Sequence, residues 1–161
     1  MWVSRNDNSS GQEEKGEQGM NEKKRSGVQT LAAVSAVLVL AAMFLSVVSS
    51  NKAYSLSHLN QLLLCCAVAI VLELLFALFY QRLPGILRDF MLLAAVFATA
   101  WAMCMLIQGR TLLAGYIYFS DLEASNPVAV SAMNLAIAAI AAYLVSIILT
   151  VAVGFSRQDK D

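Results

Sequence analysis

The chain has 161 residues, of which 59% are hydrophobic and only 14% are charged. A soluble domain usually has about a quarter of its residues charged, so this composition disfavours a soluble protein. The formal net charge is zero, which gives no reason to expect a nucleic-acid partner. Away from the edges of the long apolar runs, Glu73 is their only acid or base. The composition therefore indicates an integral membrane protein whose first partner is the lipid bilayer.

The segment before the first apolar run, residues 1–27, is polar and rich in Gly, Ser, Asn, Glu and Lys. It has too few apolar side chains to form a core, so we predict a disordered tail. Met20 precedes a basic stretch of the kind that leads into a first membrane helix. The Glu-rich run before Met20 would be written in purine-rich codons, as a bacterial ribosome-binding site is. Translation is therefore expected to start either at Met1 or at Met20, in a bacterium.

Four apolar segments follow, at residues 28–50, 57–80, 88–108 and 128–154. Each reaches the length of about 20 residues that a helix needs to cross about 30 Å of hydrocarbon. Because lipid offers no partner for backbone polar groups, such segments cross a membrane as helices. The sequence thus predicts an all-α membrane protein, a four-transmembrane-helix bundle over residues 28–154, followed by a short tail at 155–161.

The joints between these segments carry turn and capping signals. Leu83-Pro84-Gly85 is typical of a tight turn between the second and third segments. Asn126-Pro127 stands where the fourth segment begins. An Asn side chain can cap the free amides of a helix, and Pro is favoured at the first helical position. We therefore expect the fourth helix to start at this pair.

The flanking Lys and Arg residues predict the orientation, because cytoplasmic loops of membrane proteins are enriched in them. One side of the bundle carries seven such residues, and the other side carries only Lys52 and Arg110. The seven are Lys23, Lys24, Arg25, Arg82, Arg88, Arg157 and Lys160. Both termini are therefore expected in the cytoplasm, with the protein in the bacterial plasma membrane.

The longest connection, residues 109–126, is apolar at first and then acidic. Its candidate contact residues are Tyr116, Tyr118, Phe119, Asp121 and Glu123. One interpretation is a segment lying on the outer membrane surface, with its aromatic rings at the depth of the headgroups. The other interpretation is a docking surface for an extracytoplasmic partner, or a lid over the bundle.

Each apolar segment also carries a stripe of small residues at spacings of three and four, as in closely packed membrane helices. The stripes of the first and fourth segments include hydroxyl groups as well: Ala32, Ser35, Val39, Ala42, Ser46, Ser49; Ala132, Ala136, Ala139, Tyr143, Ser146, Thr150. The stripes of the second and third segments are Cys66, Ala69, Glu73, Ala77 and Met91, Ala95, Ala98, Ala102, Met105. Asn134 is expected to bond to another helix, and a second row of small residues in the fourth segment fits a neighbour in an oligomer.

Glu73 is the candidate functional residue, since it lies on a small-residue stripe and so points into the bundle. Ser35, Tyr143 and Ser146 lie at a similar depth on their own stripes and are its expected hydrogen-bonding partners. No Lys or Arg occurs at that depth, so low-dielectric surroundings favour a protonated carboxyl. Three interpretations stay open: a neutral acid that locks the packing, a proton site in a transport cycle, or a hook for a basic residue of a partner helix.

No catalytic signature accompanies this acid. The chain has no paired metal-binding histidines, nucleophile elbow, phosphate-binding glycine loop or catalytic pair of carboxylates. We therefore expect no enzyme and no cofactor or metal. The first functional hypothesis is a non-catalytic subunit or accessory component of a larger membrane complex. The alternative is an oligomeric small transporter or channel protomer, self-associating through small-residue helix faces, in which Glu73 couples transport to protons.

Overall fold

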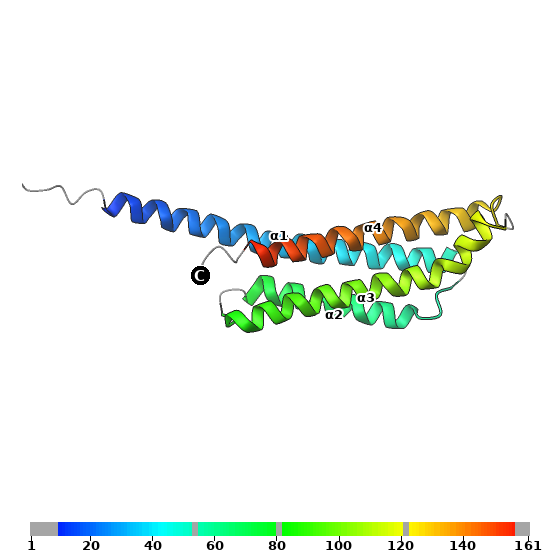
Figure 1. Ribbon diagram of the computed structural model, residues 1–161, viewed down its shortest axis with the longest axis horizontal. Coiled ribbons are helices and arrows are strands. Elements are labelled where there is room, and N and C mark those ends of the chain that lie inside the picture. Colours follow the sequence, from blue (N-terminus) through cyan, green and yellow to red (C-terminus); the bar gives the residue numbers. More distant parts are fainter. Residues whose placement is uncertain (1–9, 53–54, 80–81, 121–122, 157–161) are drawn as a thin grey trace, which may run out of the picture.

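The computed structural model describes residues 10–52, 55–79, 82–120 and 123–156, with side chains from residue 27 onward. Its elements are four helices (Figure 1): α1 (Ser10–Lys52), α2 (Leu59–Phe79), α3 (Gly85–Tyr118) and α4 (Pro127–Phe155). All four are long and apolar enough to cross a membrane, α1 through its part Gly27–Lys52. The predicted all-α architecture of four membrane-spanning lengths is therefore confirmed, and no strand occurs in the described ranges.

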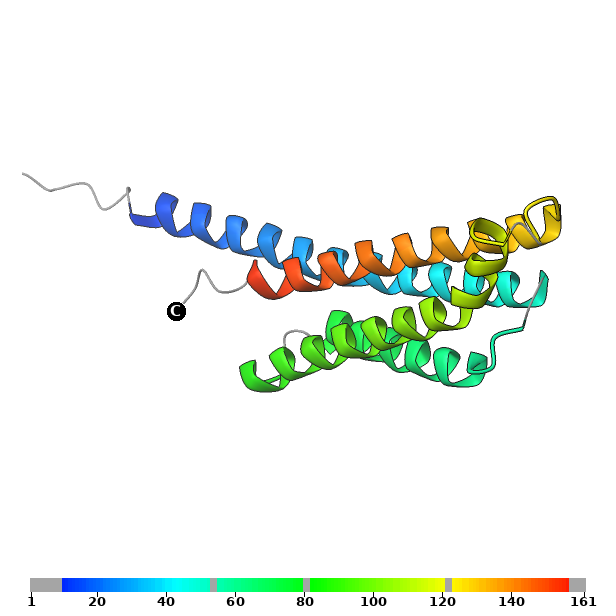
Figure 2. The same cartoon turned by 45° about the vertical axis from the view of Figure 1, so that its right-hand side comes forward.

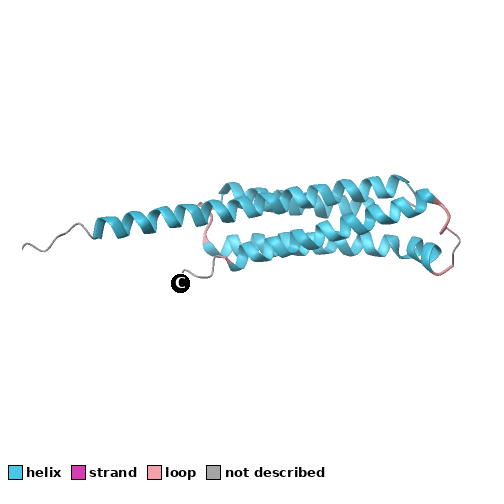
Figure 3. Ribbon diagram, turned by 90° about the horizontal axis from the view of Figure 1, so that it is seen from above, coloured by secondary structure: helices cyan, strands magenta, loops and turns pink. Residues whose placement is uncertain are grey.

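The helices form a closed ring in which α1 packs on α2 and α4, and α3 packs on the same two helices. Helix α2 thus faces α4 diagonally across the bundle. The end of α4 lies beside the middle of α1 and at the same end of the bundle as the turn between α2 and α3 (Figures 1 and 3). In the apolar stretch of each helix only 28–33% of the residues are buried inside the bundle, so most of these residues face outward.

Helix α1 is longer than the sequence suggests, because it begins at Ser10 and projects well beyond the other helices (Figure 1). The tail expected at residues 1–27 is therefore helical from Ser10 onward, while residues 1–9 lie outside the described ranges. The added stretch is rich in Glu, Gln and Lys, which are good helix formers. It also extends a helix that the membrane already nucleates, so it avoids the cost of nucleation.

Helix α3 likewise continues to Tyr118 instead of ending at 108. Its last turns bend toward the beginning of α4 (Figure 2), where Leu113 and Ile117 pack against Ala129 and Ala132. The surface-lying loop expected over residues 109–126 is thus replaced by helix over most of its length. The reason is periodicity, since Leu113 and Ile117 extend the buried stripe of α3 at helical spacing and can be covered by α4.

The start of α4 matches the capping prediction. Asn126 Oδ1 accepts hydrogen bonds from the amides of Val128 at 3.1 Å and Ala129 at 3.5 Å, and Pro127 occupies the first turn. Asn126 Nδ2 also donates to Glu123 Oε2 at 2.6 Å. Asn126 therefore joins the acidic end of the connection to the helix that follows.

The predicted stripes of α1 and α4 are all buried in the bundle. In α3, Ala95 and Ala102 are buried as predicted, and the other three buried positions up to residue 108, Leu92, Thr99 and Leu106, are each shifted by one residue. The prediction placed Met91, Ala98 and Met105 on the inward face, and in the structure these three side chains are only partly buried. Helix α2 shows the same effect, because Phe76 is fully buried and Ala77 only partly.

Candidate functional site

Glu73 lies in the interior of the bundle, with 1% of its surface exposed. Ala32, Phe76 and Val153 belong to an apolar cluster on one side of it along the bundle. Val39 and Ala69 belong to a second apolar cluster on the other side. The carboxyl group therefore occupies a polar layer between two apolar layers.

Two hydroxyl groups hold one oxygen of this carboxyl. Ser35 Oγ on α1 donates to Glu73 Oε1 at 2.9 Å, and Thr150 Oγ1 on α4 donates to the same atom at 2.8 Å. The contact with Thr150 crosses the diagonal of the bundle. Glu73 Oε2 is also buried and makes no hydrogen bond within the described part of the chain. One carboxyl oxygen thus links three helices, and the other stays available.

Ser146 completes this polar layer. Ser35 Oγ lies 2.7 Å from Ser146 Oγ and 3.1 Å from the Ser146 carbonyl oxygen. Ser35 Oγ also lies 2.7 Å from Thr150 Oγ1, which is 2.9 Å from the Ser146 carbonyl oxygen. Ser146 Oγ also lies 3.4 Å from the Ser35 carbonyl oxygen. We refer to Ser35, Glu73, Ser146 and Thr150 as the polar layer; it contains a carboxyl group, three hydroxyls and two backbone carbonyls.

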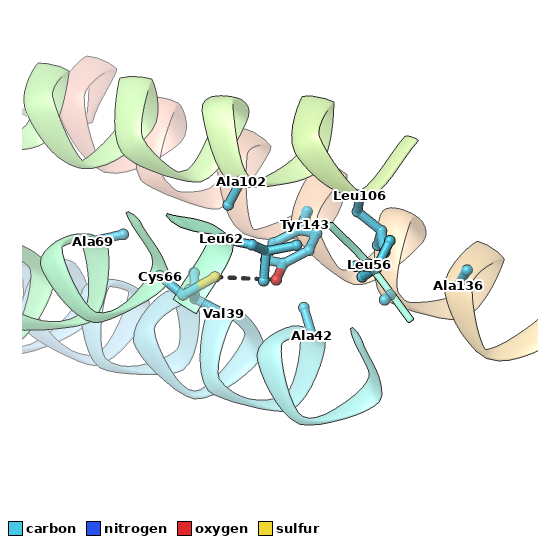
Figure 4. Packing of buried hydrophobic residues seen from close by; sticks show 11 residues of the cluster. Val39, Ala42, Leu56, Leu62, Cys66, Ala69, Ala102, Leu106, Ala136 and Tyr143 are labelled. Carbon is cyan, nitrogen blue, oxygen red and sulfur yellow. Dashed lines mark hydrogen bonds between the residues drawn. The ribbon is translucent and has the colours of Figure 1, made fainter. Parts of the chain in front are cut away.

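The sequence predicted part of this layer. Ser35 bonds directly to Glu73, and Ser146 joins through Ser35, whereas Tyr143 belongs to a different cluster. The Tyr143 hydroxyl lies 3.1 Å from Cys66 Sγ (Figure 4) and 3.4 Å from Ser46 Oγ. Thr150 was missed as a partner of Glu73. The sequence did indicate its position, because Thr150 lies one turn from Ser146 on the same inward stripe of α4.

Arg110 is the second buried charge, which sequence reasoning placed on the exposed outer flank. Its side chain is 1% exposed and is the largest fully buried one in the described ranges. Its Nε and Nη2 atoms are buried and form no hydrogen bond there. Its spacing could have indicated this burial, because Arg110 lies one turn from both Leu106 and Leu113 on the buried stripe of α3. That spacing applies only if α3 continues past residue 108.

Three of the candidate docking residues, all aromatic, are exposed at one end of the bundle. Tyr116, Tyr118 and Phe119 are 36%, 58% and 91% exposed at the end of α3. Glu123 accepts the hydrogen bond from Asn126, and Asp121 lies outside the described residues. Within the described ranges no three His, Cys, Asp or Glu side chains come together as a metal site would require.

Asn134 differs from the sequence expectation. It is exposed on α4 and makes no hydrogen bond to another described residue, so it does not bond to a neighbouring helix of this bundle. Ala138 and Ala141, at helical spacing from Asn134, are exposed with it. One turn before Asn134, Ser131 Oγ accepts a hydrogen bond from exposed Lys52 Nζ at 2.8 Å. The exposed amide thus lies between this polar pair on one side and small residues on the other.

The fold and the polar layer together define the class of protein, a multi-pass membrane protein built from four apolar helices. Comparison with family models, with curated proteins and with solved structures finds no match to this chain.

Proposed function

We propose that the chain is a non-catalytic subunit or accessory component of a larger complex in the bacterial plasma membrane, with both termini in the cytoplasm. Its partner is a membrane protein that docks a helix on the outward face of α4. The seven Lys and Arg residues that flank the apolar segments on one side, against two on the other, support this orientation.

The observation that carries the proposal is exposed Asn134. An amide has donors and an acceptor, and lipid hydrocarbon satisfies none of them. Polar side chains in membrane helices bond across to other helices, and small residues beside them let two backbones approach closely. Ala138 and Ala141 provide that small surface. A partner helix with its own polar group at this depth would satisfy Asn134.

The polar layer supports the same function in a different way. Glu73, the buried acid of α2, is bonded to hydroxyls of α1 and α4, an arrangement that fixes helix packing. A bundle stabilised from inside in this manner leaves its outward faces for contact with other proteins.

The test is co-purification in mild detergent from the native membrane. A stoichiometric partner is expected with the wild-type chain, and Asn134→Leu is expected to reduce its recovery several-fold. Leu93→Ala serves as the matched control, since Leu93 is 67% exposed on α3 and its loss alters another outward face. Recovery of only a second copy of the chain, or an equal loss in both variants, would contradict the proposal.

A second candidate function is an oligomeric transporter or channel protomer with Glu73 as the coupling acid. It is favoured by Glu73 Oε2, which is buried and has no hydrogen bond among the described residues. Reconstituted protein would then show pH-dependent flux across liposomes that Glu73→Gln abolishes. Unchanged flux in that variant would exclude the role.

A further inference from the structure

The polar layer has more oxygen pairs at bonding distance than it has protons. Seven pairs of oxygens among its four residues lie 2.7–3.4 Å apart. Each serine or threonine hydroxyl supplies one proton, so three hydroxyls satisfy three pairs. A proton on Glu73 would add a fourth. Several pairs therefore bring two lone pairs together without a hydrogen between them.

The Ser35 hydroxyl takes part in most of these oxygen pairs. Its Oγ lies within 3.1 Å of Glu73 Oε1, the Ser146 carbonyl oxygen, Ser146 Oγ and Thr150 Oγ1. One hydroxyl donates once and accepts twice, so it cannot bond to four oxygens. In addition, the second carboxyl oxygen of Glu73 accepts no hydrogen bond from the described residues. The layer is thus an oxygen-rich, proton-poor centre.

Oxygens of this kind are the ligands of hard cations. Carboxylates and backbone carbonyls are the oxygen donors that proteins offer such ions, and hydroxyl oxygens can add to them. A cation at this position would turn the pairs that lack a proton into oxygen–cation contacts, and Glu73 Oε2 would gain a partner. The contributing helices α1, α2 and α4 approach from three directions, which allows the oxygens to surround an ion.

The charge of the layer selects the kind of cation. One ionised carboxylate compensates one positive charge, whereas a divalent ion would leave a net charge between two apolar layers, which is costly. A small monovalent ion also suits a layer in which seven pairs of oxygens lie 2.7–3.4 Å apart. We propose that the polar layer is a binding site for Na⁺, in which Na⁺ replaces the proton of Glu73.

Competition with a proton follows from the single carboxylate. The groups that contact Glu73 from α1 and α4 are the hydroxyls of Ser35 and Thr150, which do not titrate near neutral pH. The other titratable groups of the core, Cys66 and Tyr143, bond to each other in the neighbouring cluster, and buried Arg110 stands on α3. Where Glu73 is mostly protonated, each unit rise in pH should lower the half-saturating Na⁺ concentration by about tenfold.

The experiment is thermal unfolding of the whole chain in detergent, titrated with NaCl against choline chloride at constant ionic strength. Binding to the folded state alone raises the melting temperature with Na⁺ concentration. We expect a saturable, Na⁺-specific rise that shifts to lower Na⁺ at higher pH. Glu73→Gln, which keeps the shape of the side chain, should remove the rise, and Thr150→Val should weaken it several-fold.

The control is Ser49→Ala, because the Ser49 hydroxyl donates to the Ala132 carbonyl at 2.7 Å between α1 and α4 but stands outside the polar layer. It should keep the full Na⁺ response, measured against its own melting temperature without Na⁺. Equal curves in Na⁺ and choline for the wild type, or a response that survives in Glu73→Gln, would overturn the proposal. If Glu73→Gln does not fold, an unweakened response in Thr150→Val would overturn it. The result is independent of partner binding through α4, so each proposal can fail alone.

Discussion

At the scale of single residues, Thr150 shows how one hydroxyl can connect three helices. It donates to Glu73 Oε1 at 2.8 Å and lies 2.7 Å from Ser35 Oγ, while its own backbone belongs to α4. Its loss leaves Glu73 with one fewer donor in a setting that water does not reach readily. The consequence can be measured without any knowledge of function.

We predict that Thr150→Val lowers the free energy of unfolding by about 1 kcal/mol, in line with hydrogen bonds between membrane helices. The valine keeps the volume of the side chain, so the change reports the hydroxyl. Reversible unfolding in a mixed detergent titration would measure it. Thr99→Val is the matched control, because the buried Thr99 hydroxyl bonds only to the Ala95 carbonyl of its own helix at 2.9 Å. An equal loss in both variants would contradict a special role for Thr150.

The same residues show how much of the site could be predicted. Ser35 and Ser146 were predictable because small hydroxyl residues at helical spacing mark the inward face. Tyr143 shares that face, but its long side chain carries the hydroxyl to Cys66 instead of Glu73. Arg110 was not predictable from composition, since its burial depends on α3 continuing past the expected end of the span. The spacing of residues identifies the inward face of a helix, whereas the atoms that a long side chain contacts can be found only from the structure.

At the scale of elements, α3 and the α1–α2 connection approach each other closely at Gly109. A Cβ built at this position would overlap Leu56 Cδ2, in the connection between α1 and α2. Leu56 is 7% exposed and belongs to the core cluster, so its side chain has little room to withdraw. The glycine therefore lets the α1–α2 connection pack directly on α3.

We predict that Gly109→Ala destabilises the bundle by about 1–3 kcal/mol, as overpacking of a core does. Shortening the neighbour in the double variant Gly109→Ala with Leu56→Ala should recover part of that loss relative to Leu56→Ala alone. A double-mutant cycle of unfolding free energies would measure the coupling. Gly115→Ala is the control, since nothing lies near a Cβ built at that glycine. Strict additivity of the two substitutions at 109 and 56 would contradict the assigned contact.

The lengths of the helices were the weakest part of the sequence prediction. Apolar length predicted the four spans, but it set their ends by the thickness of the bilayer. Helices α1 and α3 instead continue past the apolar core, one into a polar extension and the other along the start of α4. Hydropathy identifies the residues that can lie in lipid, but it does not identify the residue at which a helix ends.

At the scale of the whole molecule, the outward surface of α3 gives a direct test of membrane insertion. Trp101 is 48% exposed near the midpoint of this helix and stacks on Phe97, with ring centroids 6.1 Å apart. In a bilayer this indole would lie among acyl chains, far from the interfaces where Trp is usually enriched.

We predict that Trp101 fluorescence in liposomes is quenched most strongly by lipids brominated near the ends of their acyl chains. Trp2, the other tryptophan, is replaced by Phe in the measured variant so that one indole reports. Aqueous iodide should quench it weakly. Strong iodide quenching together with weak quenching by the brominated lipids would contradict the membrane placement of α3.

The unbroken course of α1 has a mechanical consequence. A helix from Ser10 to Lys52 is a rod about 64 Å long, and about 26 Å of it precede the first apolar turn. Ser35 is built into the same rod, so axial torque or tilt imposed on the protruding end would turn its hydroxyl relative to the carboxyl of Glu73. A partner that binds the protruding end of α1 and rotates or tilts it would therefore change the contact between Ser35 and Glu73 inside the bundle.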